Sequence, residues 1–323
     1  MRSTFVLPAY LFLLLLLASP EIGVAQGLPA FAPLNPVASS RSGVYFQPLN
    51  DQAGPRWHTG LAVDYASVIE YNQLDAADFV LDSEILRVSF AAWRNLGPRI
   101  FLQLGGSIGG AYSGFLDGFL DWYHGALGIR VSEREERPQD RFLYNIRLPD
   151  GRSIGHSSNA MFLGDLSAGV GIRHTPRLQS VVSVTLPTAT GPRGYGKGVP
   201  SVALLNTLRA PVSPRLVYEG SVGVGLTPSH GPMSSFQRTT FLALSSGFRH
   251  RLWQNQGLYA NLFYHSPYYH RTSLPALDRR ELSLDFGWIL VTRGGAEWRM
   301  GLTEDLEPGG PGVDLVFRVG RSF

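Results

Sequence analysis

The sequence predicts an all-β protein, a closed antiparallel transmembrane β-barrel of about twelve strands with a short amphipathic helix in its longest outer loop. Three observations predict this fold. Apolar and polar residues alternate with a period of two in many short segments. The links between these segments are alternately short and long. The last segment, residues 313–323, keeps the alternation and stops on Phe323.

Residues 1–25 are typical of a secretory signal peptide. Arg2 precedes an apolar run over residues 5–18, and small residues lead to an expected cleavage after Ala25. The run is too short and wrongly flanked for a membrane helix. No other stretch offers about eighteen consecutive apolar residues, which excludes a helical inner-membrane protein.

Residues 26–55 predict an extended periplasmic lead-in, because prolines recur among small and polar residues. These are Pro29, Pro33, Pro36, Pro48 and Pro55. Residues 56–323 then form the barrel. Its predicted strands are residues 57–66, 80–93, 100–112, 164–174, 178–187, 201–209, 215–226, 238–249, 258–265, 281–291, 297–303 and 313–323. Leu204 and Leu205 interrupt the alternation in one of them.

The composition excludes several classes of protein. The chain has no cysteine, so it has neither disulfides nor cysteine-ligated metals. Its formal net charge is only +3 and no basic face is clustered, so we expect no nucleic-acid partner. Nearly every basic residue is arginine, and Lys197 is the single lysine. Arginine in outer loops suits lipopolysaccharide phosphates, although a GC-rich genome would produce the same bias.

Aromatic and charged residues take different positions in the predicted strands. Aromatics at strand ends predict two interfacial girdles, with Trp57, Trp93, Tyr218, Phe248 and Trp298 at periplasmic ends and Tyr65, Tyr112 and Tyr264 at outer ends. Glycine and serine at inward positions leave room in the lumen. The predicted charged lumen-lining residues are Asp64, Arg87, Asp165, Arg173, Glu219, Arg249, Asp285, Glu297 and Arg299. Their signs are roughly balanced, so we expect them to pair and to give no strong ion selectivity.

The long segment 114–163 interrupts the strand pattern. Phe115, Leu116, Phe119, Leu120 and Tyr123 share one helical stripe, which predicts a short amphipathic helix. A hairpin over residues 142–148 and onward is expected to turn on Asp150-Gly151. A loop of this length would cap the barrel or fold into it.

Four stretches resemble a known family. GFLDGFLDWYHGALGI at 114–129, RFLYNIRLPDGR at 141–152, LGDLSAGVGIR at 163–173 and VSVTLPTATG at 182–191 are similar to the uncharacterised outer-membrane barrel family known as domain of unknown function 3187. The resemblance implies location and architecture. It implies no catalytic residues, because the family has no established activity.

One stretch has the residues of a hydrolase site. His156-Ser157-Ser158-Asn159 resembles the His-x-Ser-Asn stretch of outer-membrane phospholipase A and of lipid A deacylases. His156 and Ser158 at i, i+2 would share a strand face, with the imidazole as base and the hydroxyl as nucleophile. Of the next dozen positions, only Asp165 offers an orienting group. Serine and asparagine are also ordinary loop residues there.

Two other patterns suggest ligands but have simpler explanations. Residues 191–197 have the spacing of a phosphate loop, yet Gly198 replaces the serine or threonine that would hold magnesium, and no helix follows. Asp117, Asp121 and His124 fall on one helix face and could bind a divalent cation, although a solvated polar face looks the same. We therefore predict no metal and no cofactor.

The functional prediction is non-enzymatic passage or binding of small molecules by a bacterial outer-membrane barrel. The alternative is a lipid-directed hydrolase using His156 and Ser158, and a purely structural or surface-binding barrel is a third hypothesis. Phe323 resembles the C-terminal signal that the barrel-assembly machinery reads, although Arg321 stands where that class usually has an apolar residue. The expected partners are that machinery, outer-membrane lipids with lipopolysaccharide, and an unidentified small solute.

Overall fold

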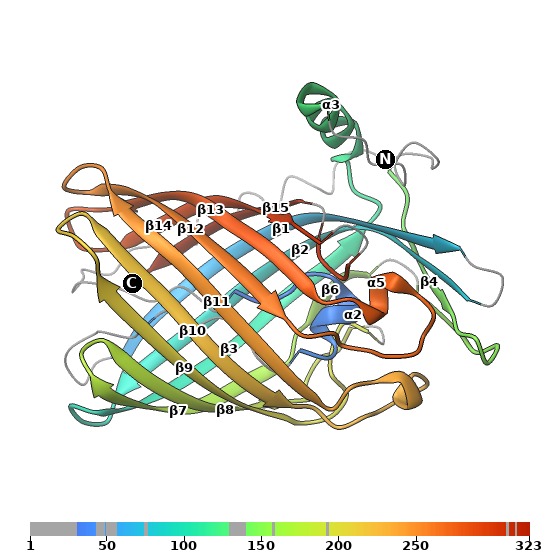
Figure 1. Ribbon diagram of the computed structural model, residues 1–323, viewed down its shortest axis with the longest axis horizontal. Coiled ribbons are helices and arrows are strands. Elements are labelled where there is room, and N and C mark those ends of the chain that lie inside the picture. Colours follow the sequence, from blue (N-terminus) through green and yellow to red (C-terminus); the bar gives the residue numbers. More distant parts are fainter. Residues whose placement is uncertain are drawn as a thin grey trace.

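The computed structural model describes residues 31–42, 49, 57–73, 77–128, 140–156, 159–191, 194–307, 310–313 and 315–323. The strands that form the barrel wall are β1 (Trp57–Gln73), β2 (Asp78–Asn95), β3 (Ile100–Tyr112), β7 (Leu166–Thr175), β8 (Leu178–Leu186), β9 (Ser201–Pro211), β10 (Leu216–Leu226), β11 (Thr240–Arg251), β12 (Gln256–His265), β13 (Glu281–Val291), β14 (Glu297–Asp305) and β15 (Leu315–Ser322). Figure 1 shows them wound into a tilted cylinder.

The wall closes on itself as an antiparallel barrel of twelve strands, as predicted. Each strand pairs with its neighbour along the chain, and β15 pairs with β1 from Gly60 opposite Ser322 to Ser67 opposite Leu315. Closure leaves no barrel edge with unpaired backbone groups, which a bilayer core requires. Short turns join the strands at the end where both Trp57 and Phe323 lie, and we call this the short-turn end. The opposite end is the long-loop end.

The pleat separates an apolar outer face from a mixed inner face. Along β10, Val222, Val224 and Leu226 are exposed, whereas Gly223 and Gly225 between them are buried. In β9, Leu204 faces outward and Leu205 faces inward against Ala203, which explains the broken alternation. Strands about 4.8 Å apart and tilted by about 40° give twelve strands a backbone diameter of about 24 Å. Inward glycine and serine cannot fill a lumen of that width.

Trp93 differs from the predicted girdle. Trp57 is 47% exposed at the short-turn end, but Trp93 is only 6% exposed because it points into the lumen. There it packs with Ala91, Phe101 and Val181. Phe101 in turn lies flat against Gly171, where an added Cβ would come within 2.0 Å of its ring. This cluster narrows the lumen near the short-turn end.

The N-terminal segment lies inside the barrel. The described residues within 26–55 therefore do not form the predicted extended periplasmic lead-in. Residues 31–42, which we call the plug, include the one-turn helix α2 (Pro36–Ser39). Pro36 opens this helix, and the Asn35 side chain caps it by accepting a bond from the Val37 amide at 2.9 Å. Figure 1 shows α2 within the barrel towards the long-loop end.

Apolar side chains seal the plug into the barrel mouth. Leu34, Val37 and Ala38 are buried in a cluster that includes Phe79 and Leu277. The cluster joins the plug to wall strands and to loops at the long-loop end, among them α5 (Pro275–Asp278). Burial of such side chains is worth about 1.5–3 kcal/mol each. The mouth thus resembles a small globular core more than an open pore.

The long segment after β3 divides into two parts. The predicted amphipathic helix is α3 (Asp117–Leu127), which lies outside the barrel (Figure 1). Leu116 and Leu120 pack on Leu315 of the wall, together with Tyr65 and Phe317. The helix therefore neither caps the barrel nor folds into it. Among the described residues, no helix is long and apolar enough to span a membrane.

The second part of the segment extends the wall. The predicted hairpin is β4 (Leu143–Arg147) and β5 (Ser153–His156), and Gly151 supplies the positive φ of its turn. β4 pairs with the outer end of β2. β6 (Asn159–Leu163) continues into β7 after a break at Gly164 and Asp165, and it pairs with the outer end of β3.

The chain end supports a first prediction about assembly. The Phe323 amide donates to the Thr59 carbonyl at 2.8 Å, and its ring lies 4.4 Å from the guanidinium of Arg321. Replacing Phe323 by Asp should leave most of the protein periplasmic and protease-sensitive, because it places a charge at the closing strand. Fractionation with protease digestion measures this. Phe323→Tyr is the matched control. Normal insertion of Phe323→Asp would contradict the role of residue 323 in closing the barrel.

Candidate functional site

An inward ion-pair group holds one end of the plug. The registers of β1, β2 and β15 place Arg87 and Arg318 opposite Asp64. Arg87 Nη2 lies 3.0 Å from Asp64 Oδ2, and Arg318 Nε lies 3.4 Å from Asp64 Oδ1. Arg87 also donates to two plug carbonyls, those of Ala32 at 2.7 Å and Pro33 at 2.9 Å. Asp64 thus orients the arginine that binds the plug.

An aromatic contact reaches the opposite wall. The Phe31 ring stacks on that of Phe263, with centroids 4.3 Å apart and planes 8° from parallel. The guanidinium carbon of Arg318 also lies over the Phe31 ring, 5.7 Å from the ring centroid. Since β2 and β12 are not neighbours in the wall, the plug crosses the lumen between them.

Arg41 fastens the other end of the plug. It is 1% exposed and donates to three carbonyls of the segment after β10: Thr227 at 2.8 Å, Pro228 at 2.9 Å and Arg238 at 2.8 Å. Burial lowers the pKa of Arg41. The three carbonyl dipoles are the groups that stabilise its charge in this enclosed position.

A second ion-pair group crosses the lumen at the short-turn end. We call Arg209, Glu219, Arg249, Glu297 and Arg299 the charge network. Glu219 accepts from Arg209 at 2.6 Å, and Glu297 accepts from Arg249 at 2.6 Å and from Arg299 at 2.7 Å. Arg249 also lies 3.9 Å from Glu219, which links the two halves. Both glutamates are less than 10% exposed.

The remaining predicted lumen residues lie at separate places. Asp285 accepts bonds from Tyr259, Asn261 and Thr303 at 3.3 to 3.4 Å. Arg173 lies over Phe101 at the short-turn end, 4.9 Å from the ring centroid.

Asp165 lies at the break before β7, where its carboxylate accepts the amides of Ala189 at 3.0 Å and Lys197 at 2.8 Å. It therefore fixes the loop that carries Lys197.

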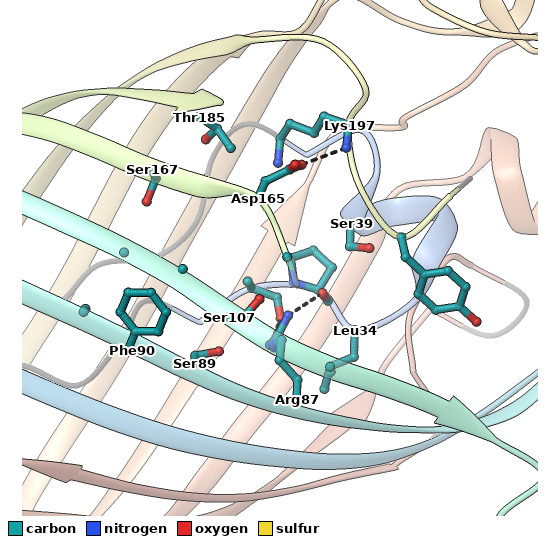
Figure 2. A pocket seen from close by; sticks show the side chains of 18 of the residues that line it. Leu34, Ser39, Arg87, Ser89, Phe90, Ser107, Asp165, Ser167, Thr185 and Lys197 are labelled. Carbon is teal, nitrogen blue, oxygen red and sulfur yellow. Dashed lines mark hydrogen bonds between the residues drawn. The ribbon is translucent and has the colours of Figure 1, made fainter. Parts of the chain in front are cut away.

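Two cavities meet beside the plug. The mouth cavity, about 580 Å³, lies among plug residues Ser40 and Arg41, the β4–β5 hairpin and loop residues in 187–191, 194–198 and 230–237. The inner cavity, about 160 Å³, lies between the plug and the wall formed by β2, β3, β7 and β8. Asp165 and Lys197 line both. Figure 2 shows Asp165 bonded to Lys197 on one side of the inner cavity and Arg87 bonded to the plug on the other.

Of the predicted hydrolase residues, the structure describes His156 and Asp165. His156 ends β5, and its ring packs on Tyr144 with centroids 4.9 Å apart. Ser158 lies outside the described residues. Asp165, the expected orienting group, binds backbone amides of another loop. No observation favours the lipid-hydrolase alternative, and it stays a prediction.

The other two patterns likewise gain no support. The loop at 191–197 includes residues outside the described part, and the Lys197 it carries lines the cavities. The Asp117 carboxylate accepts a hydrogen bond from the Asp140 amide at 2.7 Å, which gives this carboxylate a local structural role. The side chain of His124 is not among those that the structure describes. Within the described ranges, no group of three or more His, Cys, Asp or Glu residues could hold a metal ion.

Several residues of the site were missed by the sequence analysis. Arg209 and Arg318 take part in the ion pairs. Both could have been predicted, because each stands at an inward-facing position of the period-two alternation in its predicted strand. The plug residues Phe31 and Arg41 gave a weaker signal. Apolar residues around the Asn-Pro pair at 35–36 were the only hint that this segment is buried.

A closed barrel with an apolar outer belt, a polar inner face and a segment of its own chain in the lumen defines a transmembrane β-barrel of the outer-membrane type. The chain belongs to the family described as protein of unknown function (DUF3187), whose model matches residues 34–320. The resemblance drawn from the four stretches is thereby confirmed.

The chain is similar to several solved structures. The COG4313 outer-membrane channel from Pseudomonas putida F1 is 14% identical with a TM-score of 0.52, and the match covers 85% of this chain and 99% of that one. The NanC porin is 6% identical with a TM-score of 0.47 over 82% and 98% of the two chains. A Pseudomonas aeruginosa FadL homologue is 10% identical with a TM-score of 0.42 over 83% and 90%. No curated protein sequence matches this chain.

Proposed function

We propose that the protein passes small polar solutes across the bacterial outer membrane through a lumen that its own N-terminal segment closes. The observation that carries the proposal is the plug itself, which crosses the lumen and lines both cavities. A barrel with a purely structural role would need neither cavity. A solved structure of similar fold is named as an outer-membrane channel, which agrees with passage.

The two cavities give a solute a route to the plug. A solute entering at the long-loop end meets the mouth cavity, passes Asp165 and Lys197, and reaches the inner cavity. Pro33, Leu34 and Ser39 of the plug form one side of that inner cavity. Movement of the plug would therefore connect the inner cavity to the lumen above the charge network. The contacts between the plug and the wall are hydrogen bonds and stacking, so the plug can move without breaking the strand pairing of the wall.

The outer surface supports the expected lipid partners. In the proposed orientation the short-turn end faces the periplasm. Phe115, Phe119 and Trp122 of the α3 region are exposed beside wall residues Tyr65 and Phe317. An aromatic helix of this kind suits the outer lipid interface.

Solute entry into vesicles tests the proposal. We expect vesicles with the variant lacking residues 31–42 to swell in small neutral solutes about tenfold faster than vesicles with the wild type. If seating of the plug is favoured by 1.4 kcal/mol or more, fewer than about one barrel in ten is open at a time.

Faster migration of the unheated than the boiled protein on a detergent gel checks that each variant is a closed barrel. Trp122→Ala, an exposed change outside the wall, is the control and should swell like the wild type. Equal swelling of a folded deletion variant and the wild type would overturn the proposal.

A further inference from the structure

The inner cavity is lined on its wall side by hydroxyl groups from four neighbouring strands. These are Ser89 of β2, Ser107 of β3, Ser167 of β7 and Thr185 of β8. Ser89 is directly opposite Ser107, and Ser167 is directly opposite Thr185. Figure 2 shows these four side chains around one space. They form a row of donors and acceptors across the wall.

The hydroxyl row differs from other hydroxyls in this lumen. Ser221 and Ser245 are also opposite each other, and their Oγ atoms bond at 2.7 Å. Within the described part of the chain, the side chains of the four cavity hydroxyls have no hydrogen-bond partner. Their bonding capacity is therefore directed at whatever occupies the cavity.

The wall leaves room for an occupant. Gly105, Gly109 and Gly164 line the cavity between the hydroxyls. An added Cβ at Gly164 would come within 2.3 Å of Ser107 Oγ, so glycine there keeps that hydroxyl in place. The volume of about 160 Å³ is below the roughly 300–1,000 Å³ of pockets for drug-sized ligands. The occupant is consequently small.

Two aromatic rings complete the lining. Phe162 and Tyr195 are both at most 8% exposed, with ring centroids 4.9 Å apart. The Tyr195 hydroxyl is buried and has no hydrogen-bond partner among the described residues. Burial raises the pKa of this hydroxyl, so it keeps its proton. Phe162 and Tyr195 therefore give the cavity an aromatic side.

The charges around the cavity favour a neutral ligand. Arg87 is occupied by Asp64 and by the plug carbonyls. Lys197 and Asp165 lie together at the rim and contribute one charge of each sign. The charged side chains at the cavity are thus already engaged by protein groups, so a charged ligand would have to compete for them. Hydroxyl donors and acceptors, an aromatic surface and charges that are already engaged suit a compound that is rich in hydroxyls and uncharged.

We propose that the inner cavity is a binding site for a neutral polyhydroxylated solute of monosaccharide size. The proposal names the solute class for the passage proposed above and rests on it only for the route of entry. Binding to the plugged protein in detergent is a separate measurement from swelling. Binding without swelling would overturn passage alone, and swelling without binding would overturn this site alone.

Isothermal titration calorimetry with D-glucose, D-glucuronate and D-glucosamine tests the site. Glucose should bind the wild type, and the two charged sugars should bind at least about fivefold more weakly. The double variant Ser107→Ala with Ser167→Ala should bind glucose about tenfold more weakly, because two hydrogen bonds are lost. The matched control is Ser221→Ala with Ser245→Ala, which removes a hydroxyl pair elsewhere in the lumen and should leave binding unchanged.

Thr185→Val gives an independent test should the double variant misfold. It removes one hydroxyl of the row and keeps the shape of the side chain, so glucose binding should weaken about threefold or more without loss of the barrel. Absence of glucose binding to the wild type, tighter binding of a charged sugar, or unchanged binding in both the Ser107/Ser167 and Thr185 variants would overturn the proposal.

Discussion

Glu219→Gln is expected to lower the free energy of unfolding of the barrel by about 3–5 kcal/mol. Glu219 is 3% exposed and pairs with Arg209 at 2.6 Å and with Arg249 at 3.9 Å. Neutralising it leaves two enclosed guanidinium groups short of a counter-charge. Unfolding in urea with reversible refolding into detergent micelles measures the change.

An exposed ion pair supplies the control for this prediction. Asp150 pairs with Arg152 at the tip of the β4–β5 hairpin, where both side chains are 40% exposed. Asp150→Asn should lower the free energy of unfolding far less than Glu219→Gln does, because solvent screens the pair. Equal losses for Glu219→Gln and Asp150→Asn would mean that the charge network is solvated and does not stabilise the barrel.

Arg41→Met should release the plug from the long-loop end. The change removes three hydrogen bonds and leaves the carbonyls of Thr227, Pro228 and Arg238 enclosed without their donor. Each buried group left unpaired costs about 1–3 kcal/mol. The open fraction should rise towards that of the variant lacking residues 31–42, by up to about tenfold, and single-channel recordings should show correspondingly more frequent opening.

Arg152 provides a matched control for the plug variant. It also donates to a carbonyl of the segment after β10, that of Pro232, but it is not part of the plug. Arg152→Met should therefore leave the opening frequency close to that of the wild type. Identical opening of the Arg41 and Arg152 variants would show that Arg41 does not hold the plug.

The strands could be predicted because each carries its own signal. Residues 281–291 match β13 at both ends, and residues 100–112 match β3, since the period-two alternation is local and the flanking turns stop it. The wall then follows, because every strand pairs with its sequence neighbour. The position of a residue within the alternation also predicts whether its side chain faces the lumen or the outside of the barrel. Trp93 was predicted as interfacial, yet it shares the parity of Arg87 and Ala91, which are inward.

The plug could not be predicted in the same way. α2 is a single turn, too short for a helical period, and the prolines around it are equally typical of an extended chain. Its place is fixed by distant partners such as Arg87 and Thr227, which no local pattern reveals. The helix at 117–127 was predicted from its stripe, but it has apolar residues on more than one side, including Trp122. Its stripe therefore did not specify that it packs outside the barrel.

The single-channel current of the variant lacking residues 31–42 tests most directly whether the plug closes the lumen. In planar bilayers this variant should conduct steadily, whereas the wild type should conduct rarely. Adding a synthetic peptide with the sequence of residues 31–42 should block the current, and a scrambled peptide should not, because the wall retains Arg87, Phe263 and the carbonyls that bind Arg41. A folded deletion variant that conducts no more than the wild type, or a current that the peptide leaves unchanged, would contradict the account.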